Sequence, residues 1–498
     1  MKRHINTIEN YILMPASSTQ MSEAESPNVA SFLKSLNNKV DIQSTLNLNV
    51  RSMESVPTTE IELKVLDSIK DNGAKLVSLN TEQLADFRFS YPGLRMIHER
   101  FYRPALFIHE MIKTKVAHTE VDSAISVLIT DNSNTPIKDI QVIAFTDFQS
   151  RTGAQGNTNN QGIVKLRLGA NDIQRLYVYP KHSYWGYYRK NVRLTDGFKI
   201  KLQSIELRDK DSLRHFYDTS TLPVLTRKVR VGIIDTGVGP HKNLPVKGGK
   251  NFVVGEDESE YTDNGQGHGT HVAGIIAASG ELSGVAAGVE IMSYRVFSKG
   301  DSASNFAIMK AMDQAIKDEC DLINLSLGEA SEDEALIVYI KEAYKNGILC
   351  FAANGNDGRK QISFPASYSL SIAISAMGRI DTFPADSTQS STLMAPFGVD
   401  QNNYLADFSN IGMETDLIAP GVGIVSTYPN DLYAVMDGTS MSCPAATGVA
   451  ARLLSNEQHL LELPRDQVRA DEMTKFLSKN IRSMGFGPNF EGKGMLVI

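Results

Sequence analysis

Hydrophobic and polar positions alternate in different ways along the chain, and this divides it into three parts. In the first part, residues 1–115, the apolar run YILMP predicts a strand. The stretch IELKVLDSIKDNG predicts an amphipathic helix that ends at Asn72 and Gly73. We therefore expect a small α+β unit at the N-terminal end.

The second part, residues 120–208, consists of alternating apolar and polar runs that Asn, Gly and Pro separate. The runs are AISVLITD, IQVIAFTD, GIVKLRL, RLYVYP and YWGYYRKNVRL, and their period of two predicts a β-sandwich. Tyr184, Trp185, Tyr187 and Tyr188 could form a platform for a sugar or a peptide. We favour the alternative that they lie on an outer strand face or at a domain interface.

The third part, residues 209–498, alternates strand and helix patterns. The near-continuous apolar runs VRVGIID, VEIMSYRVF, CDLINLSL and GILCFAAN are typical of buried parallel strands. Between them, NFAIMKAMDQAIK and DEALIVYIKEAYKNG predict amphipathic helices, and LRDKDSLRHFYD predicts a helix that leads into this part. The expected fold class is α/β with a parallel central sheet, preceded by the α+β unit and the β-sandwich.

Composition and charge narrow the choice of function. Of the 498 residues, 42% are hydrophobic and 21% are charged, which is typical of a globular protein. The chain has 50 Lys and Arg residues and 57 Asp and Glu residues. Its sequence contains no long basic run that could bind the phosphate backbone of a nucleic acid. No apolar stretch approaches the length of a membrane helix. We therefore expect neither nucleic acid nor a membrane as a partner.

The cysteines and the first residues bear on the cellular location. The stretch MKRHINTIENYILMPASS contains Lys2 and Arg3, but its apolar segment is shorter than that of a secretory signal peptide. Cys320, Cys350 and Cys443 are odd in number and have apolar or small neighbours, which indicates buried thiols in a reducing compartment. These two observations predict a cytoplasmic location.

Three segments carry residues that could perform chemistry. VRVGIIDTGVG places Asp235 at the C-terminal end of a strand, where open α/β sheets bind ligands. DNGQGHGTHVAGIIAA places His268 between glycines at the start of a helix. MDGTSMSCPAATGVAARLL places Ser440 in the first turn of a helix, where Pro444 fits because first-turn N–H groups lack partners. Taken alone, Thr439 or Ser440 could simply cap a buried helix.

Taken together, the three segments point to nucleophilic catalysis. A serine needs a base to remove its proton, and the base needs a carboxylate that orients it. Asp235, His268 and Ser440 supply these roles, in an order that differs from the chymotrypsin and α/β-hydrolase orders. A zinc site is not expected, because the spacing of His268 and His271 is not that of HExxH and no nearby Cys or third His supports one.

At these residues the sequence resembles the subtilisin-like serine proteases, peptidase family S8. The resemblance rests on IIDTG, HGTHVAG, INLSLG, AANGNDG, LIAPGVGIVST, GTSMSCP and the closing GKGMLVI, and it covers roughly residues 209–498. It implies a serine endopeptidase that hydrolyses peptide bonds through an acyl-enzyme. In such an enzyme Asp235 orients the histidine, His268 acts as general base and then as acid, and Ser440 forms the acyl-enzyme.

The resemblance also implies an oxyanion site and a substrate-binding edge. Asn356 would donate its amide to the developing oxyanion beside the Ser440 N–H, and Asn354 is not to be confused with it. The substrate backbone would pair as an added strand with Ser326, Leu327 and Gly328.

Departures from the family pattern concern metal binding. Asn243 stands where the family often has a calcium-binding aspartate, and the loop after Ser279 is short. We therefore predict no strong calcium site and no required cofactor. Cys443 and Ala445 replace a small residue and a histidine that the family often has, and neither position carries the chemistry.

Several alternatives stay open from the sequence. An exopeptidase or a regulated peptide-processing enzyme would differ from an endopeptidase only in what blocks the cleft. A binding protein that retains the fold is a further alternative, but it has no need of the complete triad and Asn356. Asp357 could favour a basic side chain before the cleaved bond, although a solvated turn carboxylate is our preferred interpretation. The expected partners are protein or peptide substrates. The N-terminal unit is a candidate propeptide or regulatory domain that controls access to the cleft, and a docking role is its alternative.

Overall fold

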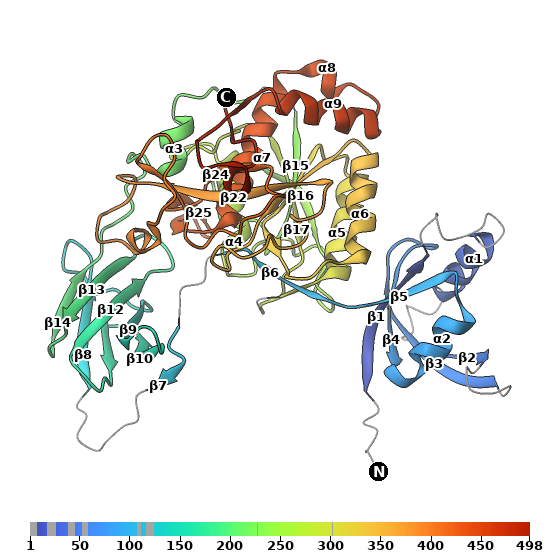
Figure 1. Ribbon diagram of the computed structural model, residues 1–498, viewed down its shortest axis with the longest axis horizontal. Coiled ribbons are helices and arrows are strands. Elements are labelled where there is room, and N and C mark those ends of the chain that lie inside the picture. Colours follow the sequence, from blue (N-terminus) through green and yellow to red (C-terminus); the bar gives the residue numbers. More distant parts are fainter. Residues whose placement is uncertain are drawn as a thin grey trace, which may run out of the picture. The chain divides into compact units, whose positions relative to one another are not determined.

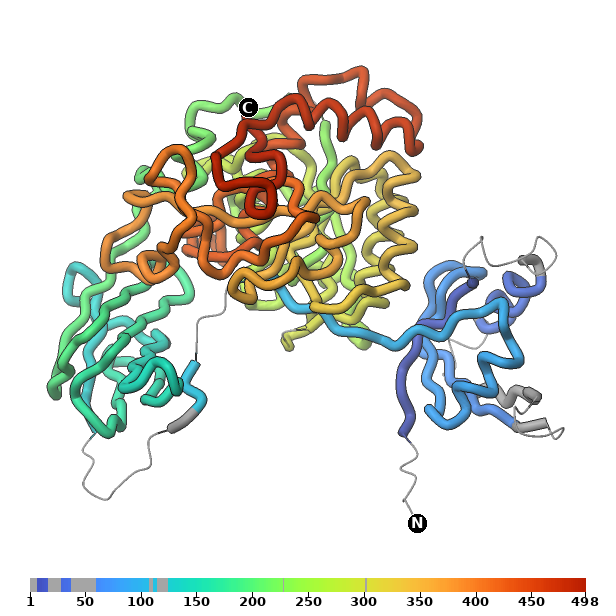
Figure 2. The backbone as a smooth tube through the Cα atoms, in the orientation of Figure 1, coloured from blue at the N-terminus to red at the C-terminus, as the bar shows by residue number. Residues whose placement is uncertain are grey.

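The structure is a computed structural model, and it describes residues 7–16, 26–37, 45–51, 58–106, 111–115, 124–226, 228–300 and 302–498. Lys2, Arg3 and the boundary residues 116–120 lie outside the described residues. The chain forms two compact units. The first comprises Met1–Tyr102, Ala303–Gln314 and Asp333–Tyr339, and the second comprises Arg103–Ser302, Ala315–Glu332 and Ile340–Ile498. Figure 2 follows the backbone from blue to red in chain order.

The N-terminal residues form one antiparallel sheet with the strand order β2-β3-β4-β1-β5. Its elements are β1 (Ile8–Pro15), α1 (Ser26–Asn37), β2 (Thr45–Arg51), β3 (Thr58–Ser68), β4 (Lys75–Asn80), α2 (Leu84–Ser90) and β5 (Leu94–His98). The predicted strand YILMP is part of β1.

The helix predicted over IELKVLDSIKDNG is wrong, because most of this stretch is strand β3. Ile61, Leu63 and Val65 are fully buried in a core that includes residues of α1 and α2, while Glu62 is exposed. The apolar residues therefore follow a period of two. Leu66 and Ile69 add apolar positions that also fit the spacing of a helix, which explains the wrong prediction.

Residues 124–204, called the β-rich segment below, form two sheets that share one core, and the short strand β7, which precedes this segment, joins one of them. Their strand orders are β13-β12-β9-β10-β7 and β11-β8-β14. Buried side chains from both sheets, such as Val127, Val142 and Val178, lie in the same cluster. The strands are β7 (Thr114–Lys115), β8 (Ile125–Thr130), β9 (Gln141–Asp147), β10 (Thr152–Asn157), β11 (Ile163–Leu166), β12 (Asp172–Tyr179), β13 (Tyr187–Arg193) and β14 (Phe198–Lys201).

The C-terminal part is built on an eight-stranded sheet with the order β16-β17-β15-β19-β21-β22-β23, in which β24 also pairs with β22. All its pairs are parallel except β22 with β23. The four predicted strands are β15, β17, β19 and β21, so the α/β prediction is confirmed. The bounds are β15 (Arg230–Asp235), β16 (Val246–Asn251), β17 (Glu290–Arg295), β19 (Leu322–Leu325), β21 (Leu349–Ala353), β22 (Ser371–Arg379), β23 (Asn403–Leu405) and β24 (Leu417–Pro420).

Helices and short strands complete this part, and Figure 1 labels most of the helices. The predicted helices are α5 and α6, and the predicted leading helix is α3. The bounds are α3 (Ser212–Tyr217), α4 (His268–Ala277), α5 (Asn305–Lys317), α6 (Glu334–Lys345), α7 (Thr439–Ser455), α8 (Gln458–Leu461), α9 (Gln467–Leu477) and α10 (Pro488–Glu491); the short strands are β6 (Phe101–Pro104), β18 (Ala303–Ser304), β20 (Leu327–Gly328), β25 (Ile424–Tyr428), β26 (Leu432–Met436), β27 (Ile481–Arg482) and β28 (Met495–Leu496).

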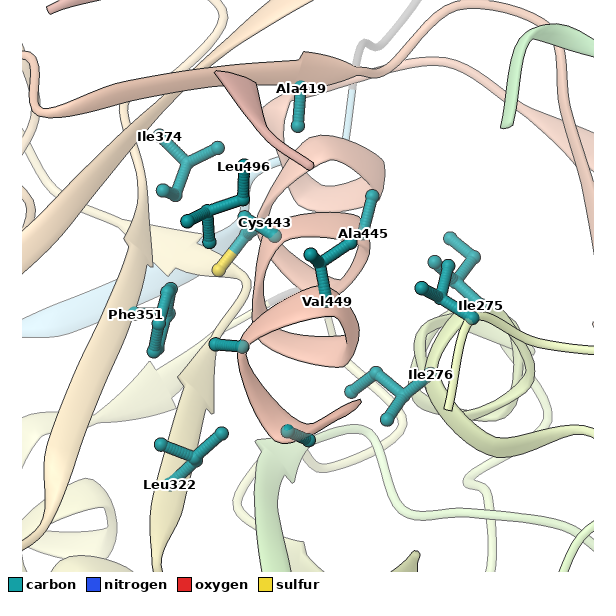
Figure 3. Packing of buried hydrophobic residues seen from close by; sticks show 14 of the residues in the cluster. Ile275, Ile276, Leu322, Phe351, Ile374, Ala419, Cys443, Ala445, Val449 and Leu496 are labelled. Carbon is teal, nitrogen blue, oxygen red and sulfur yellow. The ribbon is translucent and has the colours of Figure 1, made fainter. Parts of the chain in front are cut away.

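The core of the C-terminal part surrounds α7. All residues of this helix are buried, so its small and apolar side chains have to be accommodated on every side. Figure 3 shows Cys443 near Phe351 and Ile374 of the sheet, and Ile276 of α4 on the other side of the helix. Full burial of a valine or leucine side chain stabilises a fold by about 1.5–3 kcal/mol. The helix that carries Ser440 is therefore held firmly.

Candidate active site

Asp235 and His268 form the first pair of the site. Strand β15 ends at Asp235 and helix α4 begins at His268. The Nδ1 atom of His268 lies 2.7 Å from Oδ1 of Asp235, which also accepts the backbone N–H of Thr236 at 2.7 Å. Both residues are almost fully buried. With Nδ1 bound to the carboxylate, Nε2 is the nitrogen that can take up a proton.

Asp263 holds the loop that leads into α4. Its carboxylate accepts the N–H groups of Gly265 and Gly267, each at 2.8 Å, and the hydroxyls of Thr236 and Thr270, each at 3.1 Å. Burial raises the pKa of Asp263, although the hydrogen bonds act in the opposite direction. Asp263 was not among the residues predicted from the sequence to belong to the site. The signal was the DNG sequence, since an aspartate in a turn often binds backbone N–H groups nearby.

Ser440 is the second residue of α7. Gly438 precedes the helix with a φ of 148°, which favours glycine. The prediction that Pro444 lies in the first turn is wrong, because it is the sixth residue of the helix. A proline there leaves the carbonyl four residues earlier without its usual N–H partner. That carbonyl belongs to Ser440, and the hydroxyl of Ser326 donates to it at 3.0 Å.

The Ser440 hydroxyl donates to the carbonyl oxygen of Ser326 at 3.0 Å. Among the residues that the structure describes, Nε2 of His268 is buried and has no hydrogen-bond partner. The Ser440 hydroxyl is therefore directed at Ser326, and within the described part of the chain no hydrogen bond joins it to the histidine.

A backbone carbonyl of the chain itself lies at the centre of the site. The oxygen of Ala105 accepts the N–H of Ser440 at 3.1 Å and also accepts Nδ2 of Asn356. Oδ1 of Asn356 accepts the N–H of Thr439 at 2.9 Å and its hydroxyl at 3.0 Å. Because a backbone N–H only donates, Thr439 fixes which end of the amide faces the carbonyl. From the sequence, Thr439 was expected at most to cap the helix.

The segment around Ala105 pairs with the edge that the sequence analysis singled out. Pro104 lies opposite Leu327 and Arg103 opposite Gly328 in an antiparallel pairing. The N–H of Ala105 donates to the carbonyl of Ser326 at 3.0 Å. An extended peptide therefore fits along this edge, with one carbonyl directed at two N–H donors and beside a serine.

His271, Asn354 and Asp357, which were also considered from the sequence, form hydrogen bonds within the fold. Nε2 of His271 lies 3.0 Å and 3.2 Å from the carbonyls of Ile424 and Ala434, and burial lowers its pKa to about 3. Asn354 donates to Thr415 Oγ1 at 3.1 Å. Asp357 is exposed, and Nδ2 of Asn410 donates to its carboxylate at 2.8 Å, which fits a turn residue.

Asn243 is buried, and its Nδ2 donates to the hydroxyl of Tyr433 at 2.9 Å. A donor group therefore occupies one position where a calcium site needs an oxygen ligand. Within the described ranges, no group of three or more His, Cys, Asp or Glu residues could hold a metal ion. The lack of a strong calcium site and of a required cofactor stays a prediction.

The sequence of this part of the chain is similar to that of known proteins. The profile of the subtilase family, Peptidase_S8, matches residues 226–487. Subtilisin DY of Bacillus licheniformis is 36% identical over 276 residues, which are 54% of this chain and 88% of that protein. Subtilisin Savinase of Lederbergia lenta is 37% identical over 226 residues, 45% of this chain and 75% of that protein. M-protease of Shouchella clausii is 38% identical over 226 residues, and the match spans about half of its length, 53%.

The predicted cytoplasmic location is wrong, because the subtilisin relatives are secreted extracellular proteases. The cysteines gave a misleading signal. All three are buried, and burial raises the pKa of each thiol to about 12. A thiol that solvent does not reach stays reduced in either compartment, so its free state carries no information about location. None of the described helices has both the length and the apolar character needed to cross a membrane.

Proposed function

Because the chain belongs to the subtilase family and is a serine-type peptidase, we propose that it is an endopeptidase in which Asp235, His268 and Ser440 form the catalytic triad. Asp235 orients the ring of His268 through the 2.7 Å hydrogen bond. The Ser440 hydroxyl turns from Ser326 toward Nε2 of His268, which takes its proton as the serine oxygen attacks the substrate carbonyl carbon. His268 then donates this proton to the leaving amine.

The single observation that carries this proposal is the position of the Ala105 carbonyl. It accepts hydrogen bonds from Asn356 and from the Ser440 N–H, the two donors that would stabilise an oxyanion. The resulting tetrahedral intermediate loses its amine to leave an acyl-enzyme on Ser440, and water releases the acid in a second attack. This chemistry uses residues of the chain alone, so we propose that no cofactor is required.

The course of the chain through the site supports an endopeptidase over an exopeptidase. Arg103 and Pro104 pair with the substrate edge Ser326–Gly328 on one side of Ala105, and the chain continues through Leu106 on the other. An exopeptidase needs a group that blocks one end of the cleft. In this chain the internal segment of residues 103–106 passes through the cleft instead. The expected substrates are proteins or peptides with extended segments.

We further propose that the chain is its own first substrate, and that the bond between Ala105 and Leu106 is cleaved. The carbonyl that faces the oxyanion donors is that of Ala105, so this bond is the one presented to Ser440. The residues up to Ala105 would then be a removable propeptide. The unit predicted over residues 1–115 would end ten residues earlier, the β-rich segment would be a β-sandwich domain, and the peptidase would follow it.

The test is the intact mass of the purified full chain and of two serine variants. The wild-type chain should yield fragments that end at Ala105 and begin at Leu106, while Ser440→Ala should stay whole. Ser442→Ala is the matched control: this buried serine of the same helix donates to Ala419, and its variant should still be cleaved. Equal cleavage in Ser440→Ala would refute the triad. A whole wild-type chain that hydrolyses added peptides would refute only the self-cleavage.

A further inference from the structure

The β-rich segment borders a cavity of about 580 Å³ beside the triad histidine. On one side the cavity is lined by His268, Tyr428 and Met436, which belong to the peptidase part. On another side it is lined by Tyr179, Lys181 and Tyr184, which lie on and after strand β12 of the β-rich segment. Two parts of the sequence with different folds therefore form one cavity at the site.

This wall is attached firmly to the peptidase part. The N–H of Ser183 donates to the carbonyl of Tyr433 at 2.7 Å, and the N–H of Tyr188 donates to that of Asp386 at 2.7 Å. Trp185 is 7% exposed and packs in a cluster with Ala278, Leu282 and Val425. Trp185 thus lies at a domain interface, as the interface interpretation of the aromatic residues predicts. The loop that carries Lys181 and Tyr184 is held on both sides.

The cavity extends to the leaving-group side of the bond at Ala105. Leu106 lines it together with Arg103 and Pro104, and Leu106 is the first residue after the carbonyl that faces Asn356 and Ser440. A substrate in the same position would place the residue after its cleaved bond in this cavity.

The lining of the cavity combines aromatic rings with charged groups: Lys181 of the β-rich segment and Arg103 of the segment around Ala105 are exposed, and Asp437 of the peptidase part is buried. The rings of Tyr179, Tyr184 and Tyr428 and the side chain of Met436 offer apolar surface. Lys181 is exposed, and it forms no ion pair among the residues that the structure describes. Its charge is therefore available to a substrate.

We propose that the β-rich segment forms the leaving-group wall of the substrate cleft and selects peptides with an apolar residue directly after the cleaved bond and an acidic residue next to it. Tyr184 contacts the apolar residue and Lys181 attracts the acidic one. This inference rests on the proposed endopeptidase function and extends it to specificity.

The test compares two peptides that differ only in the second residue after the cleaved bond, Glu or Lys, with Leu as the first. Purified protein expressed as the full chain should cleave the Glu peptide with a roughly two- to fivefold higher kcat/KM, the effect of an exposed ion pair. Lys181→Glu should reverse the preference. Lys199→Glu is the matched control, since Lys199 is exposed on β14 and does not line the cavity, and it should keep the preference.

A second variant tests the aromatic surface. Tyr184→Ala should reduce the preference for Leu over Gly directly after the cleaved bond by roughly fivefold, which corresponds to about 40 Å² of apolar contact at about 25 cal/mol per Å². Preferences that are equal in wild type, Lys181→Glu and Tyr184→Ala, or a Lys199→Glu variant that shifts as much as Lys181→Glu, would overturn the inference.

A peptide anilide separates this inference from the proposed function, because it has no residue after the cleaved bond. One outcome is that wild-type protein hydrolyses the anilide while the peptide preferences do not depend on Lys181 or Tyr184. In that case the proposed role of the β-rich segment in specificity is refuted, and the proposed peptidase function is retained. If it hydrolyses neither the anilide nor the peptides, the proposed function itself fails.

Discussion

Thr439 holds the amide of Asn356, the proposed oxyanion donor, so its hydroxyl should matter for catalysis although the proposed mechanism assigns it no bond to substrate. The two groups that hold Oδ1 of Asn356 are the N–H and the hydroxyl of Thr439. The variant Thr439→Val keeps the shape and the N–H but removes the hydroxyl. It also leaves the N–H of Gly355, which donates to this hydroxyl at 3.1 Å, without its acceptor.

The expected size of the effect follows from these contacts. One neutral hydrogen bond contributes about 0.5–1.5 kcal/mol, so losing one of the two that hold the amide should lower kcat about three- to tenfold with little change in KM. Removing the amide in Asn356→Ala should lower kcat by about 10² to 10³, a range that comes from subtilisin itself. The unpaired N–H of Gly355 should lower the free energy of unfolding by about 1–3 kcal/mol.

The assay is steady-state hydrolysis of a peptide anilide at a titrated active-site concentration. Because Thr439 acts through Asn356, the double variant should be about as slow as Asn356→Ala alone. Thr447→Val is the control, since Thr447 is a buried threonine of the same helix whose hydroxyl donates to Cys443. It should lower stability and leave kcat unchanged. Wild-type kcat in Thr439→Val, or a double variant whose loss is the product of the two single losses, would refute the reasoning.

Three further predictions concern the nucleophile, calcium and pH. A fluorophosphonate should label wild type and Ser442→Ala but not Ser440→Ala, and labelling of Ser440→Ala would contradict the triad. Because Nδ2 of Asn243 faces Tyr433, EDTA should change the melting temperature little, and a fall of tens of degrees would show that a strong calcium site exists. Burial raises the pKa of Asp437 to about 6. Its neutral form is therefore favoured in the folded state, and stability falls as pH rises from about 4 to 6. Over that range the free energy of unfolding of Asp437→Asn should increase relative to wild type by up to about 3 kcal/mol, and a constant difference in urea unfolding would contradict this.

Secondary-structure elements were predicted correctly from the sequence where their pattern of apolar and polar residues fits only one kind of element. The apolar runs at β15, β17, β19 and β21 are too continuous for a half-buried surface, and the end of β15 supplied the candidate Asp235, while Asn356 was implied by the family resemblance. The stretch that became β3 satisfied both a helical and a strand period, and only packing against α1 and α2 decided between them. The first-turn position of Pro444 failed because the exact start of a helix depends on Gly438 and not on the apolar pattern.

Long-range contacts could not be predicted from local pattern. Ala105 lies in a stretch without any signal for chemistry, and its role depends on a pairing with residues more than 200 positions later. Lys181 carried no signal for function, and Tyr184 was one of four aromatic residues for which a strand face or a domain interface was preferred over a peptide platform. Their place beside His268 results from the packing of Trp185 against the peptidase part.

The two proposals together give the self-cleavage an unusual leaving group. The amine released at Leu106 belongs to the enzyme, and the backbone N–H groups of Ile112 and Lys113 bind Gln155 and Arg151 of the β-rich segment. The new terminus would therefore stay tethered near the acyl-enzyme at roughly millimolar effective concentration, where it would compete with water for the acyl group. Leu106 lines the same cavity as the leaving-group wall, so apolar burial there would also delay departure of the product. Acylation would become irreversible only when water hydrolyses the acyl-enzyme or Leu106 leaves the cavity, and the departure of Leu106 would also open the wall to another substrate.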